Sequence, residues 1–329
     1  KWMKLFKVYN YDEVEEIQFF NLSTKSESRK IKILSSLIIG SINDFDNFDV
    51  DILEKDNLTV LEAVKNKITL FDTNQTKFVY QELDEKKTVR LQGLAGSGKT
   101  ELLLHKIRKK FVDEPDARIG VTCYNKVLAD SLTTRIIDFF NTMRVTEQIS
   151  SKRLFIGHSW GSKGYPNSGL YAKICSEYGI EFRRFSYQID TSDIWKEAIH
   201  HLEQIQYEPI FDYLFIDEGQ DFDEEYITLC EMVTAKKVYI AGDILQNIFS
   251  KNSMMNTDET DYVLNKVYRT DSRTILFSHV LGFGLLESVA VRWLTNSEWE
   301  LSGYDINLEG EANQYRLKRK FINRFEGSK

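Results

Sequence analysis

The sequence predicts an α/β fold, a parallel sheet with helices on both faces, and three observations carry this prediction. From residue 68 onward, short apolar segments alternate with longer segments of helical periodicity, as in parallel strands joined by crossover helices. A glycine-rich loop follows the first of these apolar segments, at residues 93–100. Two adjacent carboxylates follow a later one, at residues 217–218, where the carboxyl ends of parallel strands form ligand sites.

Composition limits the class of protein. The chain has 329 residues, 42% of them hydrophobic and 28% charged, which is typical of a soluble globular protein with one or two domains. Apolar runs such as residues 34–39 are too short to span a bilayer, which needs about 20 residues, so no membrane association is expected. The three cysteines are scattered, which indicates a reducing, cytoplasmic location without disulfides or a zinc site. The net charge of −7 means that any nucleic-acid binding uses local basic patches.

The predicted elements divide the chain into three parts. Residues 1–68 are expected to form a small, mostly helical N-terminal appendage of unknown role. Residues 69–260 are expected to form the first lobe, which carries the glycine-rich loop. Residues 261–329, with a helix near 271–285, are expected to form the beginning of a second lobe. Within the first lobe, strands are expected at residues 89–92, 118–123, 153–157, 213–217 and 237–241, and helices at 99–111, 126–141 and 222–233. Residues 162–210 interrupt the alternation and are interpreted as a partly helical insertion on the edge of the sheet.

The glycine-rich loop fits the G-x-x-x-x-G-K-[ST] phosphate-binding pattern at every required position. Its residues are Gly93, Leu94, Ala95, Gly96, Ser97, Gly98, Lys99 and Thr100. Such a loop turns successive backbone N–H groups toward the β- and γ-phosphates of a nucleotide. Lys99 is expected to add a positive charge there, and the Thr100 hydroxyl to bind Mg²⁺. The helix after the loop buries Leu102, Leu103, Ile107 and Phe111, and this strand–loop–helix context favours a nucleotide site over a simple glycine-rich turn.

Three further motifs distinguish between classes of nucleotide hydrolase. The carboxylates at the end of the apolar strand predict that Asp217 holds Mg²⁺ and that Glu218 polarises the attacking water. Paired carboxylates also occur as ordinary helix N-terminal charges, but the preceding strand favours the functional interpretation. Further on, Gln246 follows a strand that ends in Gly-Asp and is expected to sense the γ-phosphate. Arg269, in a Tyr-Arg-Thr run, is a cation of the kind that the anionic transition state of phosphoryl transfer requires.

In this order, from about residue 71 to about residue 304, the four motifs resemble those of superfamily 1 helicases of the UvrD/Rep type. The resemblance implies a RecA-like fold, ATP and Mg²⁺ as cofactors, and an ATP-dependent DNA helicase or translocase. It implies single-stranded DNA as the partner and leaves RNA open. Gln75 resembles the glutamine that reads adenine, Tyr268 the tyrosine that stacks on adenine, and Arg269 the arginine that contacts the γ-phosphate.

The same resemblance places nucleic-acid contacts at five residues. Tyr124, Asn125 and Lys126 resemble the motif that contacts the DNA backbone, and His158 opens a His-Ser-aromatic segment like that of the family. Phe249 keeps the first aromatic residue after the Gly-Asp strand. Residues 250–253 depart from the family by replacing a glycine- and aromatic-containing segment, so we expect weaker base stacking.

The sequence leaves two points open, the completeness of the second lobe and the class of function. The later motifs of the second lobe do not occur before Lys329, so the resemblance implies an incomplete second lobe and, for these residues alone, slow or no hydrolysis. The missing lobe could come from the rest of the protein or from a protein partner. A different class of function therefore stays open as well, a non-unwinding ATP-sensing or ATPase subunit of a multi-protein defence or repair assembly.

Overall fold

The computed structural model describes residues 71–145, 150, 152–184, 190–243, 245, 260–267, 270, 272–287, 294–309 and 314–319. All the elements described below belong to one compact unit, Thr73–Glu326. The predicted appendage, residues 1–68, lies outside the described residues, and so do Gln246, Phe249, Tyr268 and Arg269.

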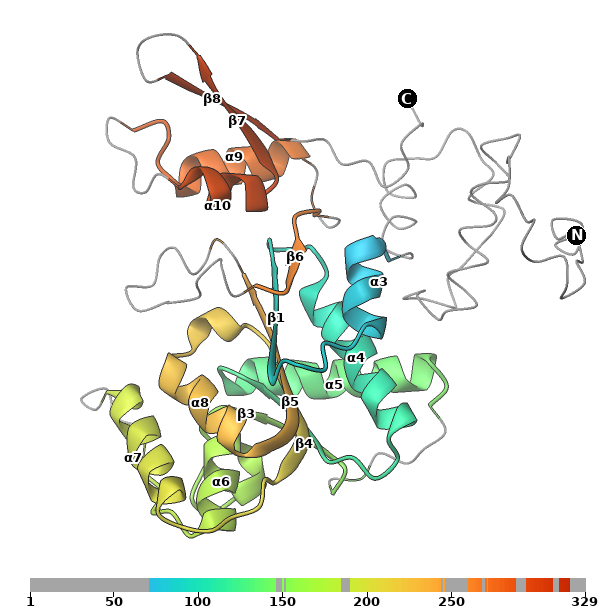
Figure 1. Cartoon of the computed structure of the whole chain (residues 1–329), viewed down its shortest axis with the longest axis vertical. Helices are drawn as coiled ribbons and strands as arrows, with labels where there is room; N and C mark the ends of the chain where they lie inside the picture. Colours follow the sequence, from blue (N-terminus) through green and yellow to red (C-terminus); the bar gives the residue numbers. More distant parts are fainter. Residues whose placement is uncertain are drawn as a thin grey trace, which may run out of the picture. The chain divides into compact units, whose positions relative to one another are not determined.

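A six-stranded sheet forms the centre of the unit, and all its strands are parallel (Figure 1). The order is β3-β2-β4-β5-β1-β6. The strands are β1 (Thr88–Gly93), β2 (Ile119–Cys123), β3 (Leu154–His158), β4 (Phe211–Ile216), β5 (Thr234–Asp243) and β6 (Tyr262–Leu264). The predicted α/β class and RecA-like sheet are confirmed. A separate antiparallel pair follows, β7 (Tyr304–Glu309) and β8 (Gln314–Arg319).

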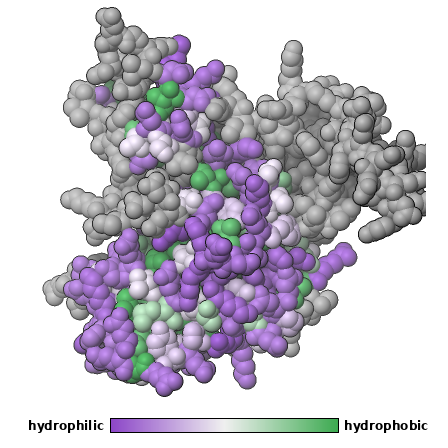
Figure 2. All heavy atoms as spheres, in the orientation of Figure 1, coloured by the Kyte–Doolittle hydropathy of each residue, from purple (hydrophilic) through white to green (hydrophobic). Residues whose placement is uncertain are grey.

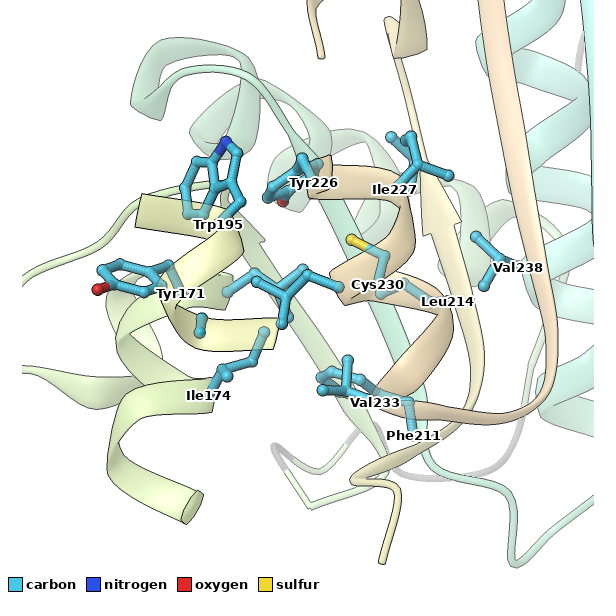
Figure 3. Packing of buried hydrophobic residues seen from close by; sticks show 14 of the residues in the cluster. Tyr171, Ile174, Trp195, Phe211, Leu214, Tyr226, Ile227, Cys230, Val233 and Val238 are labelled. Carbon is cyan, nitrogen blue, oxygen red and sulfur yellow. The ribbon is translucent and has the colours of Figure 1, made fainter. Parts of the chain in front are cut away.

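Helices cover both faces of the sheet because its central strands are apolar on both sides. One face carries Leu214 of β4 and Val238 of β5, which belong to a buried cluster with α6, α7 and α8 (Figure 3). On the other face, Phe215 stacks on Tyr239 with ring centroids 4.9 Å apart, and Phe78 of α3 packs edge-on against Tyr239. The helices are α3 (Thr73–Tyr80), α4 (Lys99–Asp113), α5 (Lys126–Thr142), α6 (Leu170–Tyr178), α7 (Thr191–Glu203), α8 (Glu224–Met232), α9 (Ser272–Gly282) and α10 (Asn296–Leu301), with 3-10 turns η4 (Pro166–Ser168) and η5 (Gly219–Asp221).

The segment interpreted as a partly helical insertion supplies two helices, and both help to cover one face of the sheet. Leu170 of α6 and Ala198 of α7 are buried in the same cluster as Phe211 of β4. Trp195 of α7 lies edge-on to Tyr226 of α8, with ring centroids 5.1 Å apart. Both helices therefore contribute to the main core, as the labelled side chains in Figure 3 show.

The carboxyl ends of the strands form one continuous edge of the sheet. Gly93 at the end of β1 pairs with Asp243 at the end of β5, and Ile216 at the end of β4 pairs with Thr122 of β2. At the other end of this edge, Cys123 of β2 pairs with His158 of β3. Neighbouring strands lie about 4.8 Å apart, so residues that follow β4, β5 and β1 meet at one place, with those of β2 and β3 beside them.

The surface of the described part is mixed. On the face shown in Figure 2, hydrophilic residues cover most of the described surface and hydrophobic residues form small, separate areas. Among the helices of the described residues, none has the length and apolar character that crossing a membrane requires.

Candidate nucleotide and nucleic-acid site

The glycine-rich loop has a backbone shape that only glycine permits without strain. Gly96 and Gly98 have φ angles of 77° and 95°, in the left-handed region where side chains are disfavoured. A Cβ at Gly93 would lie 2.5 Å from Ser97 Oγ and 2.8 Å from Leu264 Cβ, so there is no room for one. Gly98 precedes α4 without any side-chain cap, and the positive end of the helix dipole therefore faces the loop.

Lys99, the first residue of α4, is buried and held by oxygen atoms of the loop. Its Nζ donates to the carbonyl of Gly93 at 3.0 Å and to that of Leu94 at 3.2 Å. Asp243 Oδ2, from the end of β5, lies 3.4 Å away. The ammonium group thus sits where the ends of β1 and β5 meet.

Thr100 and Asp217 come together from α4 and the end of β4. The Thr100 hydroxyl donates to Asp217 Oδ2 at 3.0 Å. Burial, together with the adjacent charge of Glu218, raises the pKa of Asp217 to about 6, and the bond from Thr100 opposes this rise. The other oxygen, Oδ1, is buried and has no hydrogen-bond partner among the described residues.

The unsatisfied carboxylate oxygen and the hydroxyl fit a hard divalent cation such as Mg²⁺. No group of three or more His, Cys, Asp and Glu side chains that could hold a metal occurs among the described residues. A cation at this pair would therefore take its other ligands from water or from a phosphate, as Mg²⁺ commonly does.

Glu218 has an unusual backbone and a well-held side chain. Its φ and ψ are 54° and 48°, a left-handed conformation that costs a non-glycine residue about 1–2 kcal/mol. Gln220 Nε2 donates to Glu218 Oε2 at 2.8 Å, and Gln220 Oε1 accepts a bond from the backbone N–H of Asp243 at 2.9 Å. The Gln220 amide therefore connects the turn after β4 to the end of β5.

Gln220 was not among the predicted site residues. The signal was present, because Gln220 stands two residues after Glu218 in the same acidic run. The role of this amide depends on the adjacency of β4 and β5, because it donates to Glu218 after β4 and accepts from the N–H of Asp243 at the end of β5. The sequence does not reveal that adjacency.

Gln75 of α3 lies against the glycine-rich loop. Its side chain is buried, and its Nε2 donates to the carbonyl of Ser97 at 3.1 Å. A Cβ at Gly98 would be 3.5 Å from the same nitrogen. The contact brings α3 to the loop, while the reading of adenine by Gln75 stays a prediction.

The residues predicted to contact nucleic acid lie after β2 and β3. Tyr124 is 49% exposed, and its ring lies 5.8 Å from that of Phe222. Asn125 caps α5, because its Oδ1 accepts a bond from the Leu128 N–H at 3.0 Å, and Lys126 is exposed. His158 Nδ1 accepts from the backbone of Trp160, while burial and the charge of Lys126 lower the pKa of His158, which favours the neutral ring at pH 7.

The ends of β2 and β3 are joined by hydrogen bonds from one serine. Ser159 donates through its backbone N–H to the carbonyl of Cys123 at 2.8 Å and through its hydroxyl to the carbonyl of Tyr124 at 2.9 Å. The two segments therefore form one surface, next to the turn that follows β4. The predicted roles of Gln246, Phe249, Tyr268 and Arg269 stay predictions, because these residues lie outside the described part of the chain.

A parallel sheet with a glycine-rich loop after β1 and paired carboxylates after β4 defines a P-loop NTPase of the RecA-like class. Residues 75–252 match the model of the AAA domain family AAA_19. The match covers more than half of the 329 residues, and the chain belongs to this family. The family is found in UvrD/Rep-like superfamily 1 helicases, and the predicted resemblance is confirmed.

Three solved structures can be set beside the chain. The DUF1998 helicase MrfA bound to DNA is 13% identical, with a TM-score of 0.33, over 55% of this chain and 26% of that one. MrfA bound to DNA and AMPPNP is 12% identical with the same TM-score, over 57% and 26%. A Pif1 helicase structure on unwinding at forked DNA is 14% identical with a TM-score of 0.33, over 71% and 51%. The chain thus spans about a quarter of MrfA and half of Pif1, and no curated protein matches it.

Proposed function

We propose that the chain is the motor lobe of an ATP-dependent superfamily 1 DNA helicase or translocase. The observation that carries the proposal is the arrangement at one edge of the sheet. Lys99 and the bonded pair of Thr100 and Asp217 meet at the ends of β1, β4 and β5. The exposed side chains of Tyr124 and Lys126 follow the neighbouring strand β2. Nucleotide chemistry and strand binding would therefore share one rigid edge.

For nucleotide binding, the phosphates would occupy the concavity of the glycine-rich loop, lined by residues 95–98. Lys99 would exchange its bonds with the carbonyls of Gly93 and Leu94 for bonds with phosphate oxygens, which are stronger because both partners are charged. Gln75, which already contacts the loop through Ser97, would bind the adenine base of the nucleotide. The expected nucleotide is ATP.

Thr100 and Asp217 would hold Mg²⁺, and the ion would neutralise charge on the phosphates. With a pKa of about 6, Asp217 is mostly ionised at pH 7.5. The unsatisfied Oδ1 of Asp217 supports a role as a cation ligand.

Hydrolysis would depend on Glu218, whose carboxylate orients the attacking water and takes its proton. Gln220 would hold this carboxylate in position. Arg269 and Gln246 keep their predicted roles, stabilising the transferred phosphoryl group and sensing the γ-phosphate.

The proposed strand partner is single-stranded DNA, with RNA as the open second choice. Lys126 would contact phosphates and Tyr124 would stack on a base, and neither contact depends on base identity. The experiment that tests the proposal is ATP turnover of the full protein with and without oligodeoxythymidine. We expect turnover to rise with the oligonucleotide. Intact ATP binding without any effect of DNA or RNA would overturn the helicase assignment in favour of an ATP-sensing subunit.

A further inference from the structure

We propose that a hairpin after β3 extends the nucleic-acid surface and presents Tyr165 as a base-stacking side chain. The hairpin comprises residues 161–168 and is called the Tyr165 hairpin. This inference rests on the proposed function, because it assumes that a single strand lies along the ends of β2 and β3. The ligand it would take is one unpaired base of that strand, with a phosphate beside it.

Tyr165 is exposed in a way that the fold does not require. Its side chain is 74% exposed, and among the described residues its ring has no stacking contact and its hydroxyl has no hydrogen bond. A tyrosine offers a large, rigid apolar face at a low cost in side-chain entropy. Left in water, that face contributes little to folding and is available for contact with a ligand.

The hairpin keeps its shape without the tyrosine ring. The backbone N–H of Tyr165 donates to the carbonyl of Ser162 at 3.0 Å, and the Ser168 hydroxyl donates to the carbonyl of Tyr165 at 2.6 Å. The Ser168 hydroxyl also accepts a bond from the N–H of Ser162 at 2.9 Å. At the base of the hairpin, Gly161 has a φ angle of 89°. A Cβ added to Gly169 would lie only 2.3 Å from the backbone nitrogen of Gly161, so the two glycines pack closely. The ring is therefore held on a preorganised loop, which lowers the cost of binding.

The hairpin lies at the same edge as the residues already proposed to bind a strand. Gly169, which directly follows the hairpin, forms a parallel bridge with His158 at the end of β3. Between them, Ser159 donates a hydrogen bond to the carbonyl of Tyr124 at 2.9 Å. A strand that passes Tyr124 and His158 would thus reach the hairpin next.

The surroundings of Tyr165 favour a nucleic acid over a protein partner. Apart from the flanking Gly164 and Pro166, its exposed neighbours Ser162, Lys163 and Asn167 are polar or basic. A protein interface would need a contiguous apolar patch. The ring of Tyr165 suits the flat base of an unpaired nucleotide, and the ammonium group of Lys163 suits its charged phosphate. Stacking of this kind tolerates any base.

Three variants of the full protein test the inference: Tyr165→Ala, Tyr165→Phe and Lys163→Ala. The measurement is the binding of a fluorescent oligodeoxythymidine, by anisotropy, over a range of salt concentrations. Loss of a stacked base weakens binding by roughly 5- to 150-fold, so we expect this loss for Tyr165→Ala and near wild-type binding for Tyr165→Phe. Stacking releases no counterions, so Tyr165→Ala should keep the salt dependence. Lys163→Ala should lower the slope by about 0.7.

Melting temperature and ATP binding serve as controls, and both should stay unchanged because the ring is exposed. If wild-type protein binds the oligonucleotide and Tyr165→Ala binds it equally well, this inference is wrong and the proposed function stands. If Tyr165→Ala and Tyr165→Phe lose the same affinity for the oligonucleotide, the tyrosine hydroxyl and not the ring makes the contact. That result would also overturn the inference of base stacking. If the wild-type protein binds no single strand, the proposed function itself fails.

Discussion

The buried carboxylate of Asp217 serves the proposed cation site but lowers the stability of the folded protein at neutral pH. Its carboxylate is buried beside Glu218, and one oxygen has no partner in the described part of the chain. Its raised pKa of about 6 means that the native state holds a proton more tightly than the unfolded chain. Stability from this group is therefore full at low pH and is lost as the pH rises toward 6.

From this follows a prediction for Asp217→Asn. Without nucleotide or Mg²⁺, the variant should be more stable than wild type at pH 7.5, by up to about 3 kcal/mol, while losing ATP turnover. The difference should shrink as the pH falls toward 4, where the wild-type carboxyl is protonated. Urea unfolding at several pH values measures it. A variant less stable than wild type at pH 7.5 would contradict the assignment of a strained ionised carboxylate.

Glu218 and Gln220 support a second prediction, which separates chemistry from positioning. Glu218→Gln should keep ATP binding and lose turnover by about 10²–10⁴-fold, the usual contribution of a positioned general base. Gln220→Met keeps the length of the side chain but removes its hydrogen bonds to Glu218 and to the backbone N–H of Asp243. We expect kcat to fall roughly 10- to 100-fold with little change in KM.

Steady-state ATPase kinetics measure both variants. The matched control is Gln204→Met at the exposed end of α7, which should behave as wild type. A Gln220→Met variant that changes KM alone would show that this amide serves nucleotide binding and not the alignment of Glu218.

Helix α4 is anchored to α3 and the segment after it by a buried lysine. Lys106 donates to the carbonyls of Val79 and Gln81 at 3.2 and 3.0 Å and to Glu82 Oε1 at 2.9 Å. Burial lowers the pKa of Lys106 to about 8, although the bond to Glu82 opposes this. The same two helices carry Lys99 and Gln75, so this anchor also sets the geometry of the site.

Removing the anchor should therefore affect both stability and binding. Lys106→Met should lower the free energy of unfolding by about 1–3 kcal/mol, because the carbonyl of Val79 and the part-buried Glu82 each lose a hydrogen-bond donor. Adding Glu82→Gln should recover part of the loss, since the carboxylate is then no longer charged. Urea unfolding of the four proteins of this double-mutant cycle measures the coupling. Additive effects would mean that Lys106 and Glu82 do not act together.

The elements also show what the sequence could predict. Strong local signals placed the glycine-rich loop, α4 and the strand before Asp217, because each combines an apolar run with a distinctive end. Strand β6 was missed, since three residues give no periodicity and its pairing with β1 is long-range. The packing partners of α6 and α7 could not be predicted for a related reason. Trp195 and Leu202 give an apolar face, but sequence alone does not say which surface that face covers.

For the molecule as a whole, the order of strands decides which functions can be coupled. Strand β2 lies between β3 and β4, so the proposed strand-binding surface adjoins the catalytic turn. The backbone N–H of Asp217 donates to the carbonyl of Thr122 at 3.0 Å, two residues before Tyr124. The ring of Tyr124 lies 5.8 Å from that of Phe222, just beyond the turn that contains Glu218 and Gln220.

This adjacency supports a last prediction, on the coupling of nucleotide and strand. Tyr124→Ala should weaken the binding of oligodeoxythymidine and reduce its stimulation of ATP turnover, while turnover without DNA stays near wild type. Asn125→Ala is a poorer probe, because losing the cap of α5 would cost about 1 kcal/mol of stability by itself.

The coupling can be measured as a free energy, because linkage is reciprocal. The factor by which a non-hydrolysable ATP analogue changes the affinity for the oligonucleotide should equal the factor by which the oligonucleotide changes the affinity for the analogue. Tyr124→Ala should bring both factors closer to one by the same amount, as measured by titration calorimetry. A variant that binds DNA less tightly but keeps the wild-type factor would show that Tyr124 holds the strand without communicating with the nucleotide. The coupling between nucleotide and oligonucleotide would then depend on residues at the ends of other strands of the sheet.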